Sequence, residues 1–560
     1  MRLNKIILIA FVFSGMAALI YEVVWIRPLE FVFGSTIYTV SIIFAVFMAG
    51  LALGSRIIAK YVDKIQNLPK AYALMELGIG LYGVLLLSIF KFLPDLYRAI
   101  YPLYKNFYAF ELAQFLSVFA VLLIPTTLMG MTFPVIAKFY TREKIGKGIG
   151  EIYSANNLGA IFGSFVAGFI LIPILGIKSS IIFAGFINIF IAFIILSIVA
   201  PSFSKKIIPI SLVLFLAFAY FGNYQIKNLY SGGFYRSQYP KELLEKTKFL
   251  YYKEGLHATV AVVEDPLEGA IGLTINGKGQ GSTAFSDMRV NSLLAYLPLL
   301  FKPDAKESLV IGLGTGTTPG HLAQLTKVTT VEIEPAILGA AEHFKVINLN
   351  VLENPNHNLI IADGRNYLLK SKEKYDLIIP EPSDPWQSFS TLLFSKEFME
   401  LVKEHLKEGG IYTQWAPIYQ MRVEDFKNFY KTFNSVFPYV AAFVNVSEKE
   451  NLPVELPTTE IILLGSEEDI FIEEKLREGF VNLPREAQEE YLPAIWINSG
   501  DDLLNLLLFV GGEMEGYADK AEYITDDNVK LEFSAGRNVL FPNPEAVISD
   551  IKNFLKQNSI

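Results

Sequence analysis

The sequence predicts two structures in one chain, a multi-span α-helical membrane bundle followed by an α/β domain with a doubly wound sheet. The 560 residues are 52% hydrophobic with a mean hydropathy of +0.37, and the apolar excess lies before about residue 226. From Ser308 onward, short apolar strands alternate with helical patterns, which is typical of a parallel sheet with crossover helices. We therefore expect about seven transmembrane helices over 1–226, a small β region over 227–290 and an α/β domain over 291–560.

Seven apolar runs in the first part are each close to the length of about 20 residues that a bilayer-crossing helix needs. Small residues recur in the second and fifth runs, where they would let helices approach closely. The segment 93–110 carries aromatic residues among charges, which indicates an element at the membrane interface. The seven runs are Ile6–Trp25, Thr36–Leu53, Ala71–Phe90, Leu112–Ala137, Ile152–Ile177, Ser180–Ala200 and Ile207–Tyr224.

Two acidic residues, Glu22 and Glu76, lie within these apolar runs. A carboxylate at membrane depth is costly and is by default a functional hypothesis. Glu22 is five residues before Arg27. We interpret Glu22 as the partner of Arg27 near the interface, with contact to a substrate as the alternative.

The loops on the two sides of the predicted bundle differ in their positive charge. Twelve Lys and Arg residues lie on the side of the N-terminus and five on the other, which places the N-terminus in the cytoplasm. Seven crossings would then put the α/β domain outside the cell, where a nucleoside cofactor is scarce. The cofactor chemistry derived below favours a cytosolic domain, so we predict a multi-pass protein of the cell (inner) membrane with that domain in the cytosol.

Composition excludes several kinds of site. A net charge of −8 gives no support for nucleic-acid binding. The absence of cysteine excludes disulfides, thiolate metal sites and a cysteine nucleophile. The five histidines are scattered, so we expect no metal site.

A glycine-rich loop begins the α/β domain. The buried strand 309–311 runs directly into Gly312, Gly314 and Gly316, and a helix is expected to open near Pro319. Glycines let the backbone turn sharply and approach a ligand, while a helix N-terminus offers unpaired N–H groups. On its own this pattern is a weak sign of nucleotide binding.

Polar residues at the ends of three later strands strengthen the prediction. Glu332 ends the second strand at the spacing that suits a ribose diol, and Asp363-Gly364 follows the third. Glu381 and Asp384 follow the fourth. Open α/β sheets bind ligands at the C-terminal ends of their strands, so these residues together predict a site for a nucleoside-type cofactor. Any one of them alone would more often be a helix cap.

Residues 250–540 resemble the spermidine synthase (polyamine aminopropyltransferase) family, whose core is the S-adenosylmethionine-dependent methyltransferase fold. The whole chain resembles the membrane-fused branch of that family, in which a multi-spanning bundle precedes a synthase-like domain. The segments that carry the likeness are Tyr21-Glu22-Val23-Val24-Trp25, Asn276-Gly277-Lys278, Glu381-Pro382-Ser383-Asp384-Pro385-Trp386, Gln414-Trp415 and Thr525-Asp526-Asp527.

The resemblance implies roles for individual residues. Glu381 would deprotonate the attacking amine, with Asp384 as the second acid of the pair. The co-substrate would be decarboxylated S-adenosylmethionine or S-adenosylmethionine, without a metal, and a homodimer is expected from the family. The implied cofactor ligands are Gln280, Gly312, Gly314, Gly316, Glu332, Asp363 and Gly364, and the implied substrate ligands are Gln414, Trp415, Tyr419 and Asp526.

The chain departs from the family pattern in the part of the site that would hold the aminopropyl group. Thr315 stands where the family has an aspartate for the aminopropyl ammonium, and Val290-Asn291-Ser292 replaces a Tyr-His-Glu. Three hypotheses therefore stay open. They are aminopropyl transfer to a polyamine or a lipid-borne amine, methyl transfer from S-adenosylmethionine to a membrane acceptor, and a non-catalytic polyamine transporter or sensor.

Overall fold

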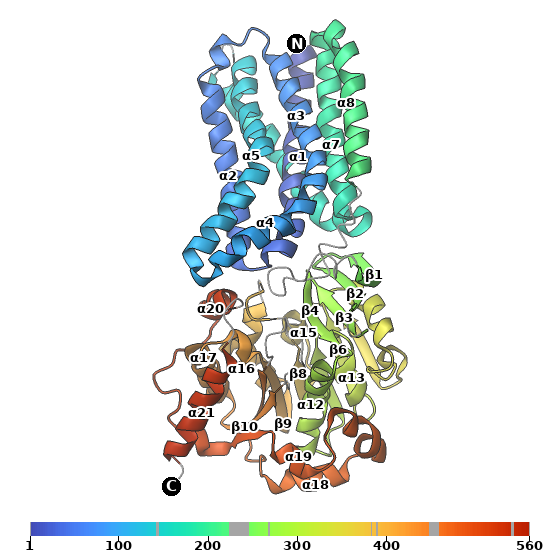
Figure 1. Ribbon diagram of the computed structural model, residues 1–560, viewed down its shortest axis with the longest axis vertical. Helices are drawn as coiled ribbons and strands as arrows, with labels where there is room; N and C mark the ends of the chain where they lie inside the picture. The colour runs from blue at the N-terminus through green and yellow to red at the C-terminus, as the bar shows by residue number, and fades with distance from the viewer. Residues whose placement is uncertain are drawn as a thin grey trace. The chain divides into compact units, whose positions relative to one another are not determined.

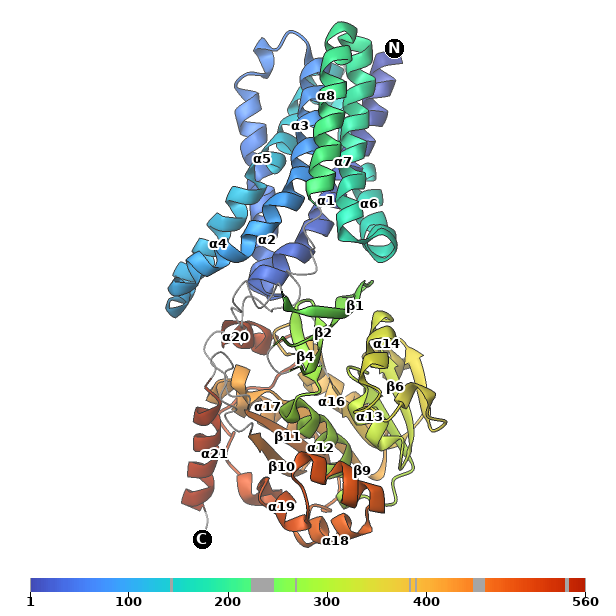
Figure 2. The same ribbon diagram turned by 45° about the vertical axis from the view of Figure 1, so that its right-hand side comes forward.

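The computed structural model describes residues 2–141, 145–222, 246–266, 269–381, 384–387, 390–446, 459–538 and 543–558. Contacts divide the chain into two units, one made mainly of residues 1–238 and the other mainly of residues 239–560 (Figures 1 and 2). We call them the helical unit and the α/β unit. The predicted boundary between residues 226 and 227 lies outside the described residues.

The helical unit contains long apolar helices, and every predicted apolar run falls mainly within one of them. By length and composition, six helices of the described residues could cross a membrane. The longest, Ile145–Val199, is divided at Gly176, whose φ of 80° and ψ of 169° are not helical. The helices are α1 (Arg2–Phe33), α2 (Ile37–Ala59), α3 (Leu68–Ile89), α4 (Leu93–Ile100), α5 (Phe107–Tyr140), α6 (Ile145–Val166), α7 (Ile172–Val199) and α8 (Pro201–Phe221).

Glycines bring neighbouring helices of this unit into close contact, as the sequence predicts. A Cβ atom at Gly159 of α6 would lie 1.8 Å from the backbone oxygen of Val12 in α1. At Gly54 of α2 it would lie 2.0 Å from the backbone oxygen of Thr127 in α5. Any larger residue at these two positions would force the helices apart.

Glu76 is buried between three helices and links them through hydrogen bonds. Its carboxylate accepts from the Ser14 hydroxyl of α1 at 2.5 Å and from the Asn188 amide of α7 at 2.6 Å. Glu22 forms no ion pair with Arg27 among the residues that the structure describes.

The α/β unit opens with a four-stranded sheet. It contains β1 (Lys248–Glu254), β2 (Thr259–Glu264), β3 (Ile271–Ile275) and β4 (Lys278–Ser282), of which β2, β3 and β4 pair antiparallel. Asn276 and Gly277 join β3 to β4 with φ values of 49° and 78°. Two consecutive positive φ angles are the signature of a type I′ hairpin turn, the geometry that the Asn-Gly pair favours.

The second sheet of this unit has eight strands in the order β12-β10-β11-β9-β8-β5-β6-β7. The five strands β5 to β9 pair in parallel, which confirms the doubly wound prediction for this part. The other three join through antiparallel pairs, so the whole sheet is mixed. The strands are β5 (Glu307–Ile311), β6 (Lys327–Glu332), β7 (His357–Ile361), β8 (Tyr375–Pro380), β9 (Leu406–Ala416), β10 (Tyr439–Val446), β11 (Thr459–Ser466) and β12 (Leu507–Val510).

The helix α12 packs its apolar residues against this sheet and forms the main core with it. Leu293, Leu297 and Leu300 of α12 are buried together with Val310 and Leu377 of the central strands. Besides α12 (Phe285–Phe301), the helices are α13 (Thr317–Leu322), α14 (Ala336–Ala341), α15 (Gly364–Lys370), α16 (Lys396–Glu404), α17 (Val423–Val436), α18 (Glu474–Asn482), α19 (Gly500–Leu504), α20 (Lys530–Asn538) and α21 (Pro544–Asn558).

One expected boundary is wrong. The sequence predicts a helix over Phe398–Leu406 that ends at Gly409-Gly410, but α16 ends at Glu404 and both glycines lie inside β9. Gly409 has a φ of 62°, and the pairing of β9 with β8 shifts register between Tyr375 and Leu377. A glycine pair also suits such a strand irregularity. Here Gly409-Gly410 lies in a strand because β9 pairs with β8.

Candidate active site

The loop between β5 and α13 has the backbone shape that its glycines predict. Gly312, Gly314 and Gly316 have φ angles of 104°, 53° and 84°, a region that other residues enter only with strain. A Cβ atom at Gly312 would lie 2.8 Å from the backbone oxygen of Glu381. Glycine therefore lets the loop lie directly against the residue that follows β8.

Glu332, the predicted ribose ligand at the end of β6, anchors this loop. One carboxylate oxygen accepts from the backbone N–H of Leu313 at 2.8 Å, and the other accepts from that of Glu334 at 2.8 Å. Burial raises the pKa of Glu332, and these two backbone donors oppose that rise. A carboxylate oxygen can accept more than one hydrogen bond, so this anchoring leaves room for a hydroxyl donor.

Asp363 caps the helix that follows β7. Its carboxylate accepts from the backbone N–H of Asn366 at 2.7 Å, which is the ordinary role of an aspartate at this position. A Cβ atom at Gly364 would lie 2.3 Å from the Ile311 side chain, so the helix packs tightly on β5. The predicted adenine contact of Asp363 stays a prediction.

Glu381 is half-buried beside the glycine loop. Its Oε1 atom is buried and has no hydrogen-bond partner among the described residues, and its Oε2 atom would lie 3.8 Å from a Cβ atom at Gly314. Burial of the carboxyl raises the pKa of Glu381 to about 7, the Thr318 hydroxyl opposes this rise, and the charge of Glu332 adds to it. A carboxyl that titrates near neutrality is suited to proton transfer.

Asp384 is fully buried and is surrounded by partners from other elements. It forms an ion pair with the Lys278 ammonium of β4, whose side chain is 6% exposed, and it accepts from the Gln420 amide. The Tyr419 hydroxyl lies 3.4 Å from its Oδ1 atom. The structure therefore places Tyr419 next to Asp384, and contact of Tyr419 with a substrate stays a prediction. Pro382 and Ser383, between the two acids, lie outside the described residues.

Three further residues predicted at the site differ in their surroundings. The side-chain nitrogen of Gln280 in β4 is buried without a partner in the described residues, which is expected of a group that meets a ligand. Gln414 is fully buried and accepts from the Tyr412 hydroxyl within β9. Trp415 hydrogen-bonds to the carboxyl of Glu460 through its side chain.

Asp526, another predicted substrate ligand, is engaged in a structural ion pair. Arg365 of α15 donates to both of its carboxylate oxygens, at 2.8 and 2.5 Å, and the Ser395 hydroxyl donates at 2.8 Å. The pair holds the turn after Ile524 against α15 and the start of α16. Contact of Asp526 with a substrate stays a prediction.

Glu460 is a buried acid at this edge of the sheet that sequence reasoning missed. It accepts from the Asn445 amide at 3.0 Å. Burial raises the pKa of Glu460 to about 7, with a further rise from Asp287 and an opposing effect from Lys278. Glu460 is the second residue of β11, which runs antiparallel to β9, so it lies at the edge where the parallel strands end.

Thr315, where the resemblance would place an acid, is buried within the glycine loop. Its hydroxyl is 2.8 Å from the Thr317 hydroxyl, and its backbone oxygen accepts from the Asn348 amide at 2.9 Å. These contacts provide no negative charge at this position.

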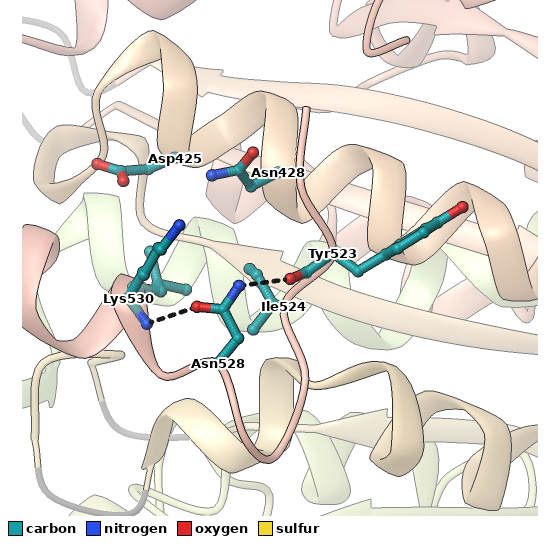
Figure 3. A pocket seen from close by; sticks show the side chains of 7 residues that line it. Asp425, Asn428, Tyr523, Ile524, Asn528 and Lys530 are labelled. Atoms are coloured by element: carbon teal, nitrogen blue, oxygen red, sulfur yellow. Dashed lines mark hydrogen bonds between the residues drawn. The ribbon is translucent and has the colours of Figure 1, made fainter. Parts of the chain in front are cut away.

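A small pocket lies between α17 and the segment 523–531 (Figure 3). Asn528 donates to the backbone oxygen of Tyr523 at 3.0 Å and accepts from the backbone N–H of Lys530 at 3.4 Å. The pocket is lined by none of the residues predicted to bind cofactor or substrate.

The sequence that forms this edge of the sheet is similar to a known protein family. Residues 287–447 match the spermine/spermidine synthase domain. The match includes the glycine loop, Glu332, Asp363, Glu381, Asp384 and Tyr419, and it ends before Glu460.

Several polyamine aminopropyltransferases are similar in sequence to this chain. Polyamine aminopropyltransferase 2 of Aquifex aeolicus is 23% identical over 414 residues, which is 72% of this chain and 77% of that protein. The polyamine aminopropyltransferase of Oceanobacillus iheyensis is 22% identical over 75% of this chain and 80% of its own length. The one from Saccharolobus solfataricus is 33% identical, over 31% of this chain and 61% of its own length.

Solved structures of spermidine synthases also resemble part of the chain. One, in complex with the transition-state analogue AdoDATO, has a TM-score of 0.38 at 18% identity, over 46% of this chain and 83% of that structure. Spermidine synthase from Thermotoga maritima has the same TM-score at 19% identity, over 46% of this chain and 84% of its own.

Proposed function

We propose that the α/β unit transfers an aminopropyl group from decarboxylated S-adenosylmethionine to a primary amine and releases methylthioadenosine. The observation that carries this proposal is the carboxyl of Glu381, which lies beside the glycine loop with Oε1 unpartnered among the described residues. The match of residues 287–447 to the spermine/spermidine synthase domain, and the relatives named polyamine aminopropyltransferase, support the reaction class.

The proposed chemistry needs a base and a positioned amine. The acceptor enters as an ammonium ion, and Glu381 removes one proton to expose the nitrogen lone pair. That lone pair forms a bond to the aminopropyl carbon next to the sulfonium sulfur. The carbon–sulfur bond breaks, and its electron pair returns to sulfur. The positive charge moves from sulfur to the new secondary ammonium ion, so atoms and charges balance.

The residues of the proposed nucleoside site fit the co-substrate. The left-handed glycines leave the loop without Cβ atoms where a ligand would approach, and the buried amide nitrogen of Gln280 offers a donor. In this proposal Glu332 holds the ribose hydroxyls. Asp363, next to Gly364, accepts from the adenine amino group.

We further propose that the acceptor is a polyamine or a lipid-borne amine, and that the protein is a multi-pass protein of the cell membrane with its α/β unit in the cytosol. The six helices long and apolar enough to cross a membrane support the membrane part of this proposal. The co-substrate supports the cytosolic part, because a nucleoside cofactor is scarce outside the cell.

The deciding experiment identifies the nucleoside product. The full chain, purified in detergent, is incubated with decarboxylated S-adenosylmethionine and a panel of primary amines, and methylthioadenosine is measured by mass spectrometry. Product that depends on both the amine and Glu381 supports the proposal. Absence of methylthioadenosine with every amine, in a preparation that binds the co-substrate, contradicts it.

Methyl transfer from S-adenosylmethionine is the second candidate, and Thr315 favours it. Decarboxylated S-adenosylmethionine carries an aminopropyl ammonium that an acid would recognise, whereas Thr315 is paired to Thr317 and provides no charge. The same incubation with S-adenosylmethionine separates the two reactions. S-adenosylhomocysteine as the product would replace aminopropyl transfer with methyl transfer.

A further inference from the structure

The ammonium of Lys278 lies inside the candidate active site rather than on the surface. The type I′ turn at Asn276-Gly277 fixes the start of β4, and the Asn276 side chain accepts from the backbone N–H of Thr259 at 2.9 Å. Lys278, the first residue after the turn, is 5% exposed and reaches Asp384. A lysine is rarely buried unless its charge is paired, so this pair accounts for its position.

The contacts of Asp384 leave little capacity for a second cation. One oxygen of its carboxylate faces the Lys278 ammonium, and the other accepts from the Gln420 amide with the Tyr419 hydroxyl at 3.4 Å. A substrate ammonium could bind Asp384 only by displacing Lys278. That displacement would leave a lysine charge buried without its partner, which is costly.

The charge of Lys278 also reaches the second buried acid at this edge. Lys278 lowers the pKa of Glu460, which is otherwise raised by burial and by Asp287. One ammonium from the protein itself therefore lies within electrostatic reach of two carboxyl groups. Glu381 differs from both, because its Oε1 atom has no partner in the described part of the chain.

We propose that Lys278 determines acceptor specificity by occupying the cation position at Asp384, so that the site takes a primary amine with a single positive charge. This inference rests on the proposed aminopropyl transfer and, of the two acceptors proposed above, selects a singly charged lipid-borne amine over a polyamine. The amine would bind at Glu381, the carboxyl that is available. A diamine would gain nothing from its second ammonium, because Lys278 already provides that charge.

Binding measurements test this role without relying on turnover. We would measure the dissociation constants of n-butylamine and 1,4-diaminobutane by calorimetry, using the full chain in detergent with methylthioadenosine present. The wild-type chain is expected to bind the two amines within about threefold of each other. Lys278→Met leaves Asp384 without its cation, so 1,4-diaminobutane should bind at least about tenfold more tightly than n-butylamine.

Two matched variants show whether the gain comes from the vacated charge position. Lys278→Arg keeps a cation and should keep the wild-type ratio. Lys278→Met combined with Asp384→Asn removes both charges and should lose the diamine preference. If Lys278→Met does not fold, the wild-type ratio decides alone.

Several results would overturn the inference. They are a wild-type preference for the diamine of more than about tenfold, failure of both amines to bind, and a folded Lys278→Met chain with an unchanged ratio. Amine binding of the expected pattern without methylthioadenosine release in the turnover assay would instead sustain this inference and contradict the proposed reaction.

Discussion

Replacing Glu381 with glutamine should abolish most of the transfer activity and remove its dependence on pH near neutrality. The carboxyl has a pKa raised to about 7 by burial, against an ordinary value of 4.5. With that pKa, roughly 10% of the protein carries the ionised base at pH 6 and roughly 90% at pH 8. Because a base must be deprotonated to accept a proton, kcat should rise about tenfold over this interval. With a pKa of 4.5, the ionised fraction would exceed about 95% throughout, and the profile would be flat.

Glutamine preserves the shape of the side chain but cannot accept the proton. Loss of a general base lowers rates by roughly 100- to 10,000-fold, equivalent to about 3–5 kcal/mol of transition-state stabilisation. The assay is methylthioadenosine release at saturating amine and co-substrate from pH 5.5 to 8.5. Glu353→Gln is the control, because Glu353 is exposed and pairs with Lys345 on the surface. A Glu381→Gln chain within threefold of wild type, or a wild-type profile flat from pH 6 to 8, would refute the assignment of Glu381 as the base.

Other variants test the loop and the ion pair of the α/β unit. Gly312→Ala should weaken methylthioadenosine binding by at least about tenfold, because its Cβ atom would meet the backbone oxygen of Glu381. Gly314→Ala adds only backbone strain of about 1 kcal/mol, so this variant should bind methylthioadenosine more tightly than Gly312→Ala does. Equal losses of affinity in calorimetry would contradict this order. Glu332→Gln turns one acceptor into a donor that faces a backbone N–H, so urea unfolding should show a loss of about 1–3 kcal/mol, and an unchanged midpoint would argue against the anchoring role. Asp526→Asn should cost about 1 kcal/mol, since the pair with Arg365 is partly exposed. Arg365 lowers the pKa of Asp526, so the stabilisation from this pair is present above the pKa of Asp526 in the unfolded state. It should be lost as the pH falls through the lower pKa of the folded state. An acid unfolding curve of Asp526→Asn that matches the wild-type curve would contradict this role.

The parts of the site that lie in one stretch of sequence could be predicted, because the pattern itself encodes their geometry. Gly312, Gly314 and Gly316 follow a buried strand directly, and their left-handed backbone is the conformation that glycine favours. Asn276-Gly277 predicts its own turn in the same way. The apolar runs can likewise be recognised from sequence alone, but six rather than seven helices of the described residues are long and apolar enough to cross a membrane, because the fifth and sixth runs fall within the one helix Ile145–Val199.

The partners of Asp384 could not be predicted, because they come from distant elements. Lys278 lies in the first sheet and Gln420 follows β9, so only the folded sheets bring them to one carboxylate. Glu460 reaches the same edge because β11 runs antiparallel to β9, and nothing in its local sequence indicates that direction. The prediction that a helix ends at Gly409-Gly410 was wrong because a glycine pair is equally compatible with the end of a helix and with an irregular strand such as β9.

The hydrogen bond from the glycine loop to Glu332 has a consequence for binding kinetics. A loop rich in glycine has more conformational freedom to lose than any other, and a ligand that had to order it would bind more weakly. Because Glu332 already holds the N–H group of Leu313, that ordering happens during folding of the protein. The nucleoside should therefore meet a preformed cradle, and its association should be a single step whose rate rises linearly with ligand concentration.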